Sequence, residues 1–466
     1  VAALTSTALS SINDGAFGKL STTVLQALTT GQMQHLTDKQ IKSLSSDQLN
    51  NLESADLQKL STAQVAALSA TQVSKLSTDQ LNALTTTQFS SLSAIQVGGL
   101  TSAQISNLST DHVKALTSGQ AATLTATQLN GLTSTQMAAL DTADVASLNA
   151  SAVGKLSTAN VAALSSDQVK AFSVSQLQTL GSAQMQALGE DVAALSTSQL
   201  ANLRATQVSA MTTAQLNSLS TTQLRSLTGS QVAGLTTAQI TSLDSAELNA
   251  LTTTQFASLS AIQVGGLTTA QMASLSTDHV KALTTGQAAT LSANQLNALD
   301  TADLAAMGTA QIVKLSAEQV AGLSTSQLQA LSNTQVSALE GRQVKGLTTG
   351  QMANLTTGQV QALTADSVIA QISETAVHLL AADAQLLEHL KEARLAFEVG
   401  VVVGDRAAVG GVVDRGQLDP VPMNTGDGPG GAVVDAGFGV IAAGLHDVAD
   451  QQVLAVLPQR EPSWVE

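Results

Sequence analysis

The sequence of 466 residues has no cysteine and no tyrosine, and it contains few prolines, aromatic residues or charged residues. The lack of cysteine excludes disulfide bonds, thiolate metal ligands and cysteine nucleophiles. Only 19 lysines and arginines stand against 34 acidic residues, and a net charge of −15 offers no cationic surface for phosphate groups. We therefore expect no nucleic-acid partner. No run of about 18 apolar residues occurs, so we also expect no membrane-spanning helix.

An eight-residue repeat organises most of the chain. From Leu60 onward its units read LSTAQVAA, LSATQVSK and LSTDQLNA, and 46 units run from Leu4 to residue 370. One unit, LGEDVAA at Leu188, has only seven residues. The block 84–132 recurs almost unchanged at 251–299. Duplication of this kind lengthens a repeat array, whereas it would add nothing to a unique active site.

Each unit carries the signals of a short capped helix. Position 1 is Leu in 42 units, and position 2 is Ser or Thr in 35 units and Asp, Asn or Gly in eight more, with Glu53, Arg204 and Glu340 as the exceptions. Position 5 is Gln in 33 units, and position 6 is always apolar. Ser/Thr-x-x-Gln is the capping box, and positions 1 and 6 match the hydrophobic staple. The pattern predicts a helix of about six residues in every unit.

Helices this short are not stable alone in water, so successive units must pack on one another. We therefore predict an all-α fold over residues 1–370, a solenoid or superhelix of short capped helices with one helix per repeat. A β-solenoid is the alternative, because its short coils can also be rich in Ser and Thr. The high content of Leu, Gln and Ala favours the helical interpretation.

The pattern ends near residue 370, beyond which lie all five prolines and the single tryptophan. Residues 371–398 are predicted to form an amphipathic helix that caps the array. Residues 399–466 form a segment rich in Val, Gly and Pro, of uncertain fold. The composition of this C-terminal part also resembles the product of an out-of-frame reading of a GC-rich gene, which is an alternative explanation for it.

The candidate catalytic or metal-binding side chains within the array stand at position 5 of their repeats. The pairs Asp111-His112 and Asp278-His279 could serve acid-base catalysis or bind a metal, but each histidine replaces the usual Gln and is interpreted as a variant capping partner. In three repeats an acidic residue at this position follows an Asp at the cap: Asp144 with Asp141, Glu247 with Asp244, and Asp303 with Asp300. Acids in a first helical turn suit the helix dipole.

The C-terminal part offers two weaker candidates. Glu388, His389 and Glu392 could lie close together on one helix, but their spacing is not that of a zinc motif. The stretch Gly426 to Gly431 lacks the nonapeptide period of calcium-binding loops and is interpreted as a turn. No catalytic triad, phosphate loop or dinucleotide motif is present. We therefore predict no enzyme activity, no cofactor, and no catalytic, cofactor-binding or metal-binding residues.

Strings such as LTTAQMASLSTDHVKALTTGQ resemble the Leu-Thr-x-x-Gln-Val repeats of large surface or secreted proteins of proteobacteria. The resemblance covers about residues 4–370. It implies an extracellular or cell-surface protein, adhesin-like or filament-forming, that uses no cofactor.

Two functions follow as hypotheses. The first is a structural protein, a subunit of an extracellular bacterial filament or surface fibre that assembles head to tail into a homopolymer. The second is an adhesin or binding solenoid that presents a long groove to a peptide, a glycan or a host receptor. In the second, the blocks 84–132 and 251–299 would be two copies of one binding face, with Phe89 and Phe256 as ligand contacts.

Overall fold

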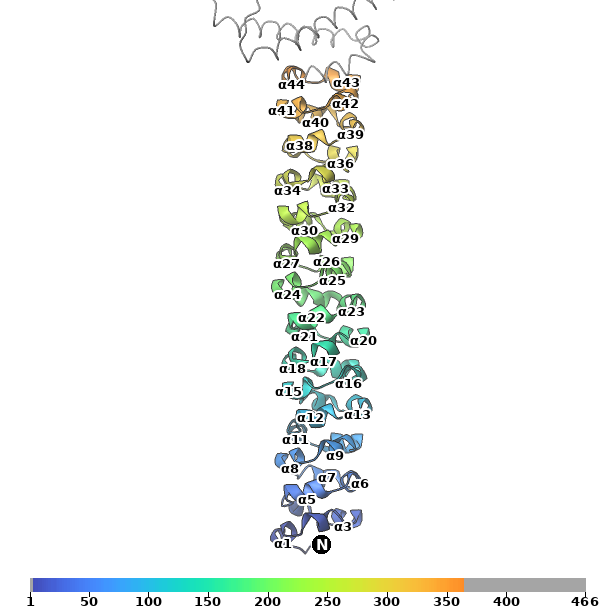
Figure 1. Cartoon of the computed structure of the whole chain (residues 1–466), viewed down its shortest axis with the longest axis vertical. Coiled ribbons are helices and arrows are strands. Elements are labelled where there is room, and N and C mark those ends of the chain that lie inside the picture. The colour runs from blue at the N-terminus through green and yellow to red at the C-terminus, as the bar shows by residue number, and fades with distance from the viewer. Residues whose placement is uncertain (1–2, 364–466) are drawn as a thin grey trace, which may run out of the picture. The chain divides into compact units, whose positions relative to one another are not determined.

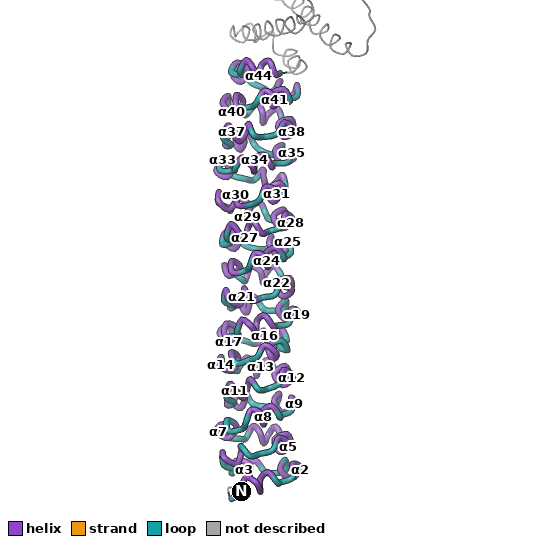
Figure 2. Tube along the Cα trace, turned by 90° about the vertical axis from the view of Figure 1, so that its left-hand side faces the viewer, coloured by secondary structure: helices purple, strands orange, loops and turns teal. Residues whose placement is uncertain are grey.

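The computed structural model describes residues 3–363, and these contain short helices and no strand. The prediction of an all-α solenoid is confirmed, and the β-solenoid alternative is wrong for this part of the chain. Figure 2 shows the regular alternation of helix and loop along the trace. The predicted capping helix at 371–398, the segment 399–466 and the candidates Glu388, His389, Glu392 and Gly426 to Gly431 lie outside the described residues.

The chain divides into two compact units, 1–307 and 308–466. The helices of the first unit, up to its irregular repeat, are α1 (Ser6–Ser10), α2 (Asp14–Phe17), α3 (Thr22–Gln26), α4 (Thr30–Met33), α5 (Asp38–Ser43), α6 (Ser46–Asn50), α7 (Ser54–Leu57), α8 (Thr62–Ala66), α9 (Ala70–Ser74), α10 (Thr78–Ala83), α11 (Thr86–Ser90), α12 (Ala94–Gly98), α13 (Ser102–Ser106), α14 (Thr110–Lys114), α15 (Ser118–Ala121), α16 (Ala126–Gly131), α17 (Ser134–Ala139), α18 (Thr142–Ser147), α19 (Ala150–Val153), α20 (Thr158–Ala162), α21 (Ser166–Ala171), α22 (Val174–Thr179) and α23 (Ser182–Ala187).

The first unit continues with the 3₁₀ helix η1 (Gly189–Ala194) and then α24 (Thr197–Ala201), α25 (Ala205–Ser209), α26 (Thr213–Asn217), α27 (Thr221–Ser226), α28 (Gly229–Ala233), α29 (Thr237–Ser242), α30 (Ser245–Ala250), α31 (Thr253–Ala257), α32 (Ala261–Gly265), α33 (Thr269–Ala273), α34 (Thr277–Ala282), α35 (Thr285–Ala288), α36 (Ala293–Ala298) and α37 (Thr301–Ala305). The described helices of the second unit are α38 (Thr309–Val313), α39 (Ala317–Ala321), α40 (Thr325–Ala330), α41 (Asn333–Ser337), α42 (Gly341–Lys345), α43 (Thr349–Ala353) and α44 (Thr357–Ala362).

A corner of two extended residues joins successive helices. At one such corner Leu132 has φ −65° and ψ 139°, and Thr133, the N-cap of α17, has φ −69° and ψ 161°. Both conformations lie in the β region, which any L-residue adopts without strain. The corner therefore needs neither glycine nor proline. Among the described residues only Gly189 has a positive φ.

The helices of the first unit wind in chain order around one axis (Figure 1). Each helix packs against the helix three places further along, as in the series α9, α12, α15 and α18. The second unit shows the same pattern, with α38 against α41 and α41 against α44. A helix that cannot survive alone is thus stabilised by neighbours from adjacent turns.

The core of the array consists of the side chains at positions 1 and 6. Val65 and Leu68 are 0% and 4% exposed, and the pattern repeats in nearly every unit. The staple predicted from the sequence is therefore present, with position 1 directly before the N-cap and position 6 at the fourth helical residue. Burial of each Val or Leu contributes about 1.5–3 kcal/mol. The stability of the array is spread over many small, similar contributions.

Candidate functional site

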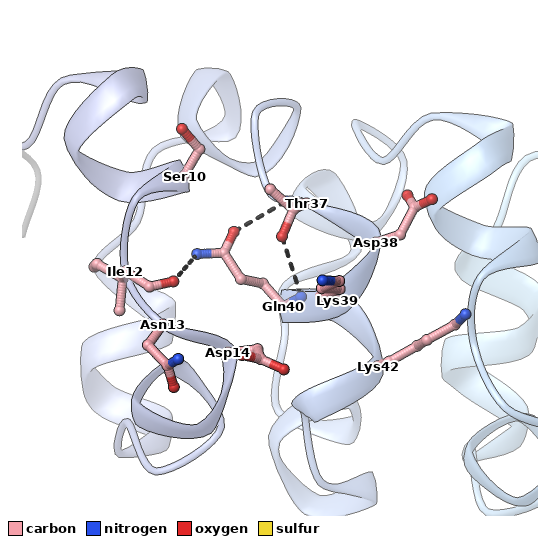
Figure 3. Close-up of a pocket in the computed structure, with 9 residues that line it drawn as sticks. All are labelled: Ser10, Ile12, Asn13, Asp14, Thr37, Asp38, Lys39, Gln40 and Lys42. Carbon is pink, nitrogen blue, oxygen red and sulfur yellow. Dashed lines mark hydrogen bonds between the residues drawn. The ribbon is translucent and has the colours of Figure 1, made fainter.

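The most distinctive polar feature of the array is the buried glutamine at position 5, which we call the glutamine node. Figure 3 shows one of them, Gln40, in α5. Its Oε1 accepts a hydrogen bond from Thr37 N at 2.9 Å, and its backbone N–H donates to Thr37 Oγ1 at 3.2 Å. These two bonds form the predicted capping box. Its Nε2 donates to Leu9 O and to Ile12 O, each at 2.9 Å, and so reaches the preceding turn.

The same geometry recurs along both units. Gln176 donates to Val145 O at 2.9 Å and to Leu148 O at 2.7 Å, and Gln343 donates to Ile312 O and Leu315 O. The acceptors lie 28 and 31 residues upstream of the glutamine. The first belongs to the corner three repeats back, and the second to the last turn of the helix four repeats back. One turn of the solenoid therefore contains between three and four repeats.

The glutamine node joins turns as well as capping a helix. A net intramolecular hydrogen bond contributes about 1 kcal/mol, whereas an unpaired buried polar group costs about 1–3 kcal/mol. Because the corner carbonyls are buried between turns, an amide donor there prevents that cost. Sequence analysis identified only the capping half of this role. The signal for the other half was the preference for Gln over Glu, because a capping box accepts either residue but only Gln carries an N–H donor.

The first three eight-residue repeats carry no glutamine at position 5; they have Ala8, Ala16 and Val24 instead. The first glutamine of the series is Gln32, and its Nε2 donates to Leu4 O at 2.8 Å. The turn formed by residues 4–27 therefore provides carbonyl acceptors to the next turn and presents no amide donor of this kind itself.

His112 and His279 reproduce the glutamine node with an imidazole ring. Nε2 of His112 lies 2.8 Å from Leu84 O, and Nδ1 lies 2.6 Å from Ser109 Oγ. A carbonyl oxygen only accepts, so Nε2 carries a proton and bonds to the corner carbonyl as a glutamine amide does. His279 makes the same contacts with Leu251 O and Ser276 Oγ. The histidines are 5% and 4% exposed, and their interpretation as structural replacements agrees with this geometry.

Phe89 packs edge-on against His112 with ring centroids 5.0 Å apart, and Phe256 packs in the same way against His279 at 4.9 Å. Both phenylalanines are 0% exposed. The hypothesis that they contact a ligand is therefore wrong, because they occupy the core position 6. The exposed apolar side chains of the duplicated blocks are instead Ile95 and Ile262, which are 76% and 78% exposed.

An asparagine at position 7 of the preceding turn can accept the N-cap N–H in place of the position-5 side chain. Oδ1 of Asn82 accepts the Ser109 N–H at 2.8 Å, a bond that the His112 ring does not make. Asn130 accepts the Ser157 N–H in the same way, in a repeat whose position-5 residue is Asn160 rather than Gln. Each asparagine belongs to the preceding turn, so the compensating bond also links turns.

An acidic residue at position 5 provides no amide donor to the preceding turn. Asp144 is 2% exposed; its Oδ1 accepts from Ser118 Oγ at 3.2 Å, and its Oδ2 has no hydrogen-bond partner. Burial raises the pKa of the Asp144 carboxyl, and the charge of Asp141 raises it further, while hydrogen bonds from Ser118 and from the Asp141 backbone oppose the shift. An ionised carboxylate has no proton to donate to the upstream carbonyls.

The other acidic nodes differ in how they are satisfied. Oδ1 of Asp303 accepts from Thr277 Oγ1 at 2.6 Å, and Asp300 caps the Asp303 N–H at 2.7 Å. Glu247 is half-buried, and it forms a reciprocal capping box with Asp244 through bonds of 2.8 and 2.7 Å. Glu247 thus takes part in capping as a glutamine does. For Asp144 and Asp303 the side chains chiefly contact a hydroxyl of the preceding turn.

The three unusual caps lack a side-chain cap bond. Glu53, Arg204 and Glu340 accept no hydrogen bond from the N3 backbone. Gln207 and Gln343 still accept from the backbone N–H of Arg204 and Glu340, at 3.0 and 2.8 Å. Half of the capping box therefore remains at both positions.

The seven-residue unit is absorbed by a change of helix type. Its residues form η1, in which Gly189 adopts φ 56° and Val192 takes the buried core position. The 3₁₀ helix rises more steeply per residue than an α-helix, which suits a shortened unit. η1 still packs against α21 and α26, each three elements away. The stacking of turns continues through the irregular repeat.

One further feature of the surface is a cavity near the start of the array. A cavity of about 600 Å³ lies beside the Gln40 node, lined by Ser10, Asn13, Asp14, Thr37, Lys39 and Lys42 among others (Figure 3). It is open to solvent and its lysines and aspartates carry opposite charges. Within residues 3–363 no group of three or more His, Asp or Glu side chains is arranged to hold a metal ion. No helix in that range is long and apolar enough to cross a bilayer.

Six stretches of the chain match the ALTTAQ repeat family: residues 49–86, 137–174, 189–221, 213–245, 240–277 and 296–333. The chain is a repeat protein, and these stretches are similar to ALTTAQ repeats. One matched stretch includes Asp144, and another begins at Gly189 within the shortened repeat. The name matches the sequence around the node, from the Ala before the corner Leu to the position-5 Gln. Comparison of the chain with curated proteins gave no match.

Proposed function

We propose that this ALTTAQ-repeat chain is a structural protein without enzyme activity, a subunit of an extracellular bacterial filament or surface fibre. The observation that carries the proposal is the glutamine node, which recurs within each compact unit and bonds most turns to the one before. Such an array is stabilised by nearest-neighbour contacts and can be lengthened by duplication without disturbing a unique site. The length of the array can therefore change without a change of fold.

The first described turn carries apolar side chains that a further solenoid turn, such as one from a second copy of the chain, would cover. Leu4 is 39% exposed, and Ile12 and Leu20 are half-buried, whereas position 1 is buried in the units that follow. Ala16 is also exposed. Since this turn presents no glutamine donors, a second copy packed against it would be held by burial of apolar side chains rather than by further glutamine nodes.

The proposal is tested by sedimentation and electron microscopy over a concentration series. We expect fibres of uniform diameter that lengthen with concentration, and we expect Leu4→Lys combined with Ala16→Lys to shorten them. Ile95→Lys is the control, because Ile95 is exposed on a helix far along the array. A chain that remains monomeric at every concentration would contradict the filament proposal.

A binding role is the second candidate, and the two exposed isoleucines favour it. Ile95 and Ile262 occupy equivalent places in the duplicated blocks, and large apolar side chains are otherwise rarely exposed in the described residues. A peptide, glycan or host receptor would meet each of them in the same local sequence, AIQVGG. Under this proposal Ile95→Ser with Ile262→Ser abolishes capture of host cells, while Leu4→Lys does not.

We propose an extracellular or cell-surface location for either role. The absence of cysteine and the low charge support a protein that is insensitive to redox and ionic conditions. Protease treatment of intact cells tests this proposal. Loss of the chain before any loss of a cytoplasmic marker is expected, and complete protection would contradict it.

A further inference from the structure

A stretch of the first compact unit, nearly one turn long, lacks glutamine nodes. Position 5 is Asp144, Ala152 and Asn160 in three consecutive units, on α18, α19 and α20. Between residues 32 and 359, every other replacement of the position-5 glutamine stands alone between units that have one. The run equals the three-place interval between stacked helices, so it affects three successive contacts across one boundary between turns.

The three replacements leave three corner carbonyls without the amide that their neighbours receive. Leu92, Leu100 and Leu108 accept from Gln120, Gln128 and Gln136 at 2.7 Å. The next three corners are Leu116, Leu124 and Leu132, and none of them receives a side-chain amide. The ladder resumes when Gln168 donates to Leu140 O at 2.7 Å.

Some links still cross this boundary. Ser118 Oγ donates to Asp144 Oδ1, Asn160 Nδ2 donates to Leu129 O at 2.7 Å, and Asn130 bonds to the Ser157 N–H. The apolar packing also continues, because Val145, Val153 and Val161 are 0% exposed. The turn is thus stabilised by its apolar core and by a few hydrogen bonds, most of them near Asn160. The buried Oδ2 of Asp144 has no hydrogen-bond partner.

We propose that this boundary, between the corners Leu116 to Leu132 and the helices α18 to α20, is a seam at which the solenoid opens first. The stability of a repeat array is a sum of local terms, so the turn with the weakest link has the highest population of open states. The seam exists whether or not the chain forms a fibre. In a fibre under load it is the point that yields before the turns on either side.

Hydrogen exchange of the full chain, followed by mass spectrometry, tests the seam. Peptides from 140–163 are expected to exchange about tenfold faster than peptides from 84–107 and 251–274, whose position-5 residues are all Gln. The variant Asp144→Gln, Ala152→Gln, Asn160→Gln restores the donors. It is expected to slow exchange at 140–163 to the rate of the reference turns.

A reciprocal variant keeps the test independent of how well the new glutamines pack. Gln88→Asp, Gln96→Ala, Gln104→Asn transfers the seam sequence to a regular turn, and exchange at 84–107 is expected to rise to the rate of 140–163. Equal exchange of the three regions in the unmodified chain would overturn the proposal. So would a reciprocal variant whose exchange at 84–107 is unchanged.

Discussion

Asn82 and His112 satisfy the cap of one helix together, although they lie on adjacent turns of the solenoid. His112 fills the glutamine position and bonds to Leu84 O, and Asn82 accepts the Ser109 N–H that the imidazole does not bind. The same division recurs with Asn249, His279 and Ser276. A substitution at position 5 is therefore linked to a residue on the turn below.

This linkage predicts a coupling between the two side chains. Asn82→Ala alone should destabilise the turn by about 1 kcal/mol, because the Ser109 N–H loses its acceptor. In a His112→Gln background the new Gln can accept that N–H, so the cost of Asn82→Ala should fall to that of the bond from Asn82 Nδ2 to Asn107 O alone. A double-mutant cycle by hydrogen exchange measures the difference. Additive effects would show that the cap is not shared, and His35→Gln, at an exposed histidine, serves as the control.

The donor role of the node predicts that glutamate cannot replace a buried glutamine. Gln120 is 1% exposed and donates to Leu92 O at 2.7 Å, so Gln120→Glu buries a charge and removes the donor. We expect a loss of about 3 kcal/mol in the free energy of opening that turn. Gln58→Glu is the matched control, because Gln58 is exposed. Equal effects of the two changes in exchange or melting experiments would argue that capping alone explains the glutamine.

Sequence patterns were sufficient for the helix, the cap and the staple, because all three depend on residues within one unit. The links between turns involve residues 28 to 31 positions apart, which no local pattern relates. Phe89 illustrates the limit, since an aromatic residue at a core position looks the same in sequence as one on a binding face. Position 5 is Gln in 33 repeats and Glu in only one, and this preference could have revealed that the side chain must donate a hydrogen bond.

The raised pKa of Asp144 predicts a pH-dependent contribution to stability. Below the ordinary pKa of 3.8 the carboxyl is neutral in both the folded and unfolded states, and the folded turn keeps its full stability. As the pH rises, the unfolded state ionises first, so stability falls until the pH passes the raised folded pKa, and it is constant above that. Asp144→Asn removes this dependence and, with Asn160 as the precedent, adds a donor toward the preceding turn.

We therefore expect Asp144→Asn to stabilise the turn at pH 7 by about 1 kcal/mol and to have little effect at pH 3. Melting curves and hydrogen exchange at both pH values measure the change. Asp79→Asn removes the same charge from an exposed site and should produce no such difference. A benefit of Asp144→Asn that is as large at pH 3 as at pH 7 would refute the assignment to ionisation.

Two glycines with opposite surroundings test how closely the turns approach. A Cβ at Gly18 would lie 2.5 Å from Ser43 O, on the helix three places further along, whereas a Cβ at Gly119 would meet no atom within 4 Å. Gly18→Ala should separate α2 from α5 and cost about 1–3 kcal/mol. Gly119→Ala, inside α15, should instead stabilise by about 0.5–1 kcal/mol, because alanine loses less backbone entropy in a helix. Similar shifts in melting temperature for the two variants would show that backbone contact at Gly18 does not limit the spacing of the turns.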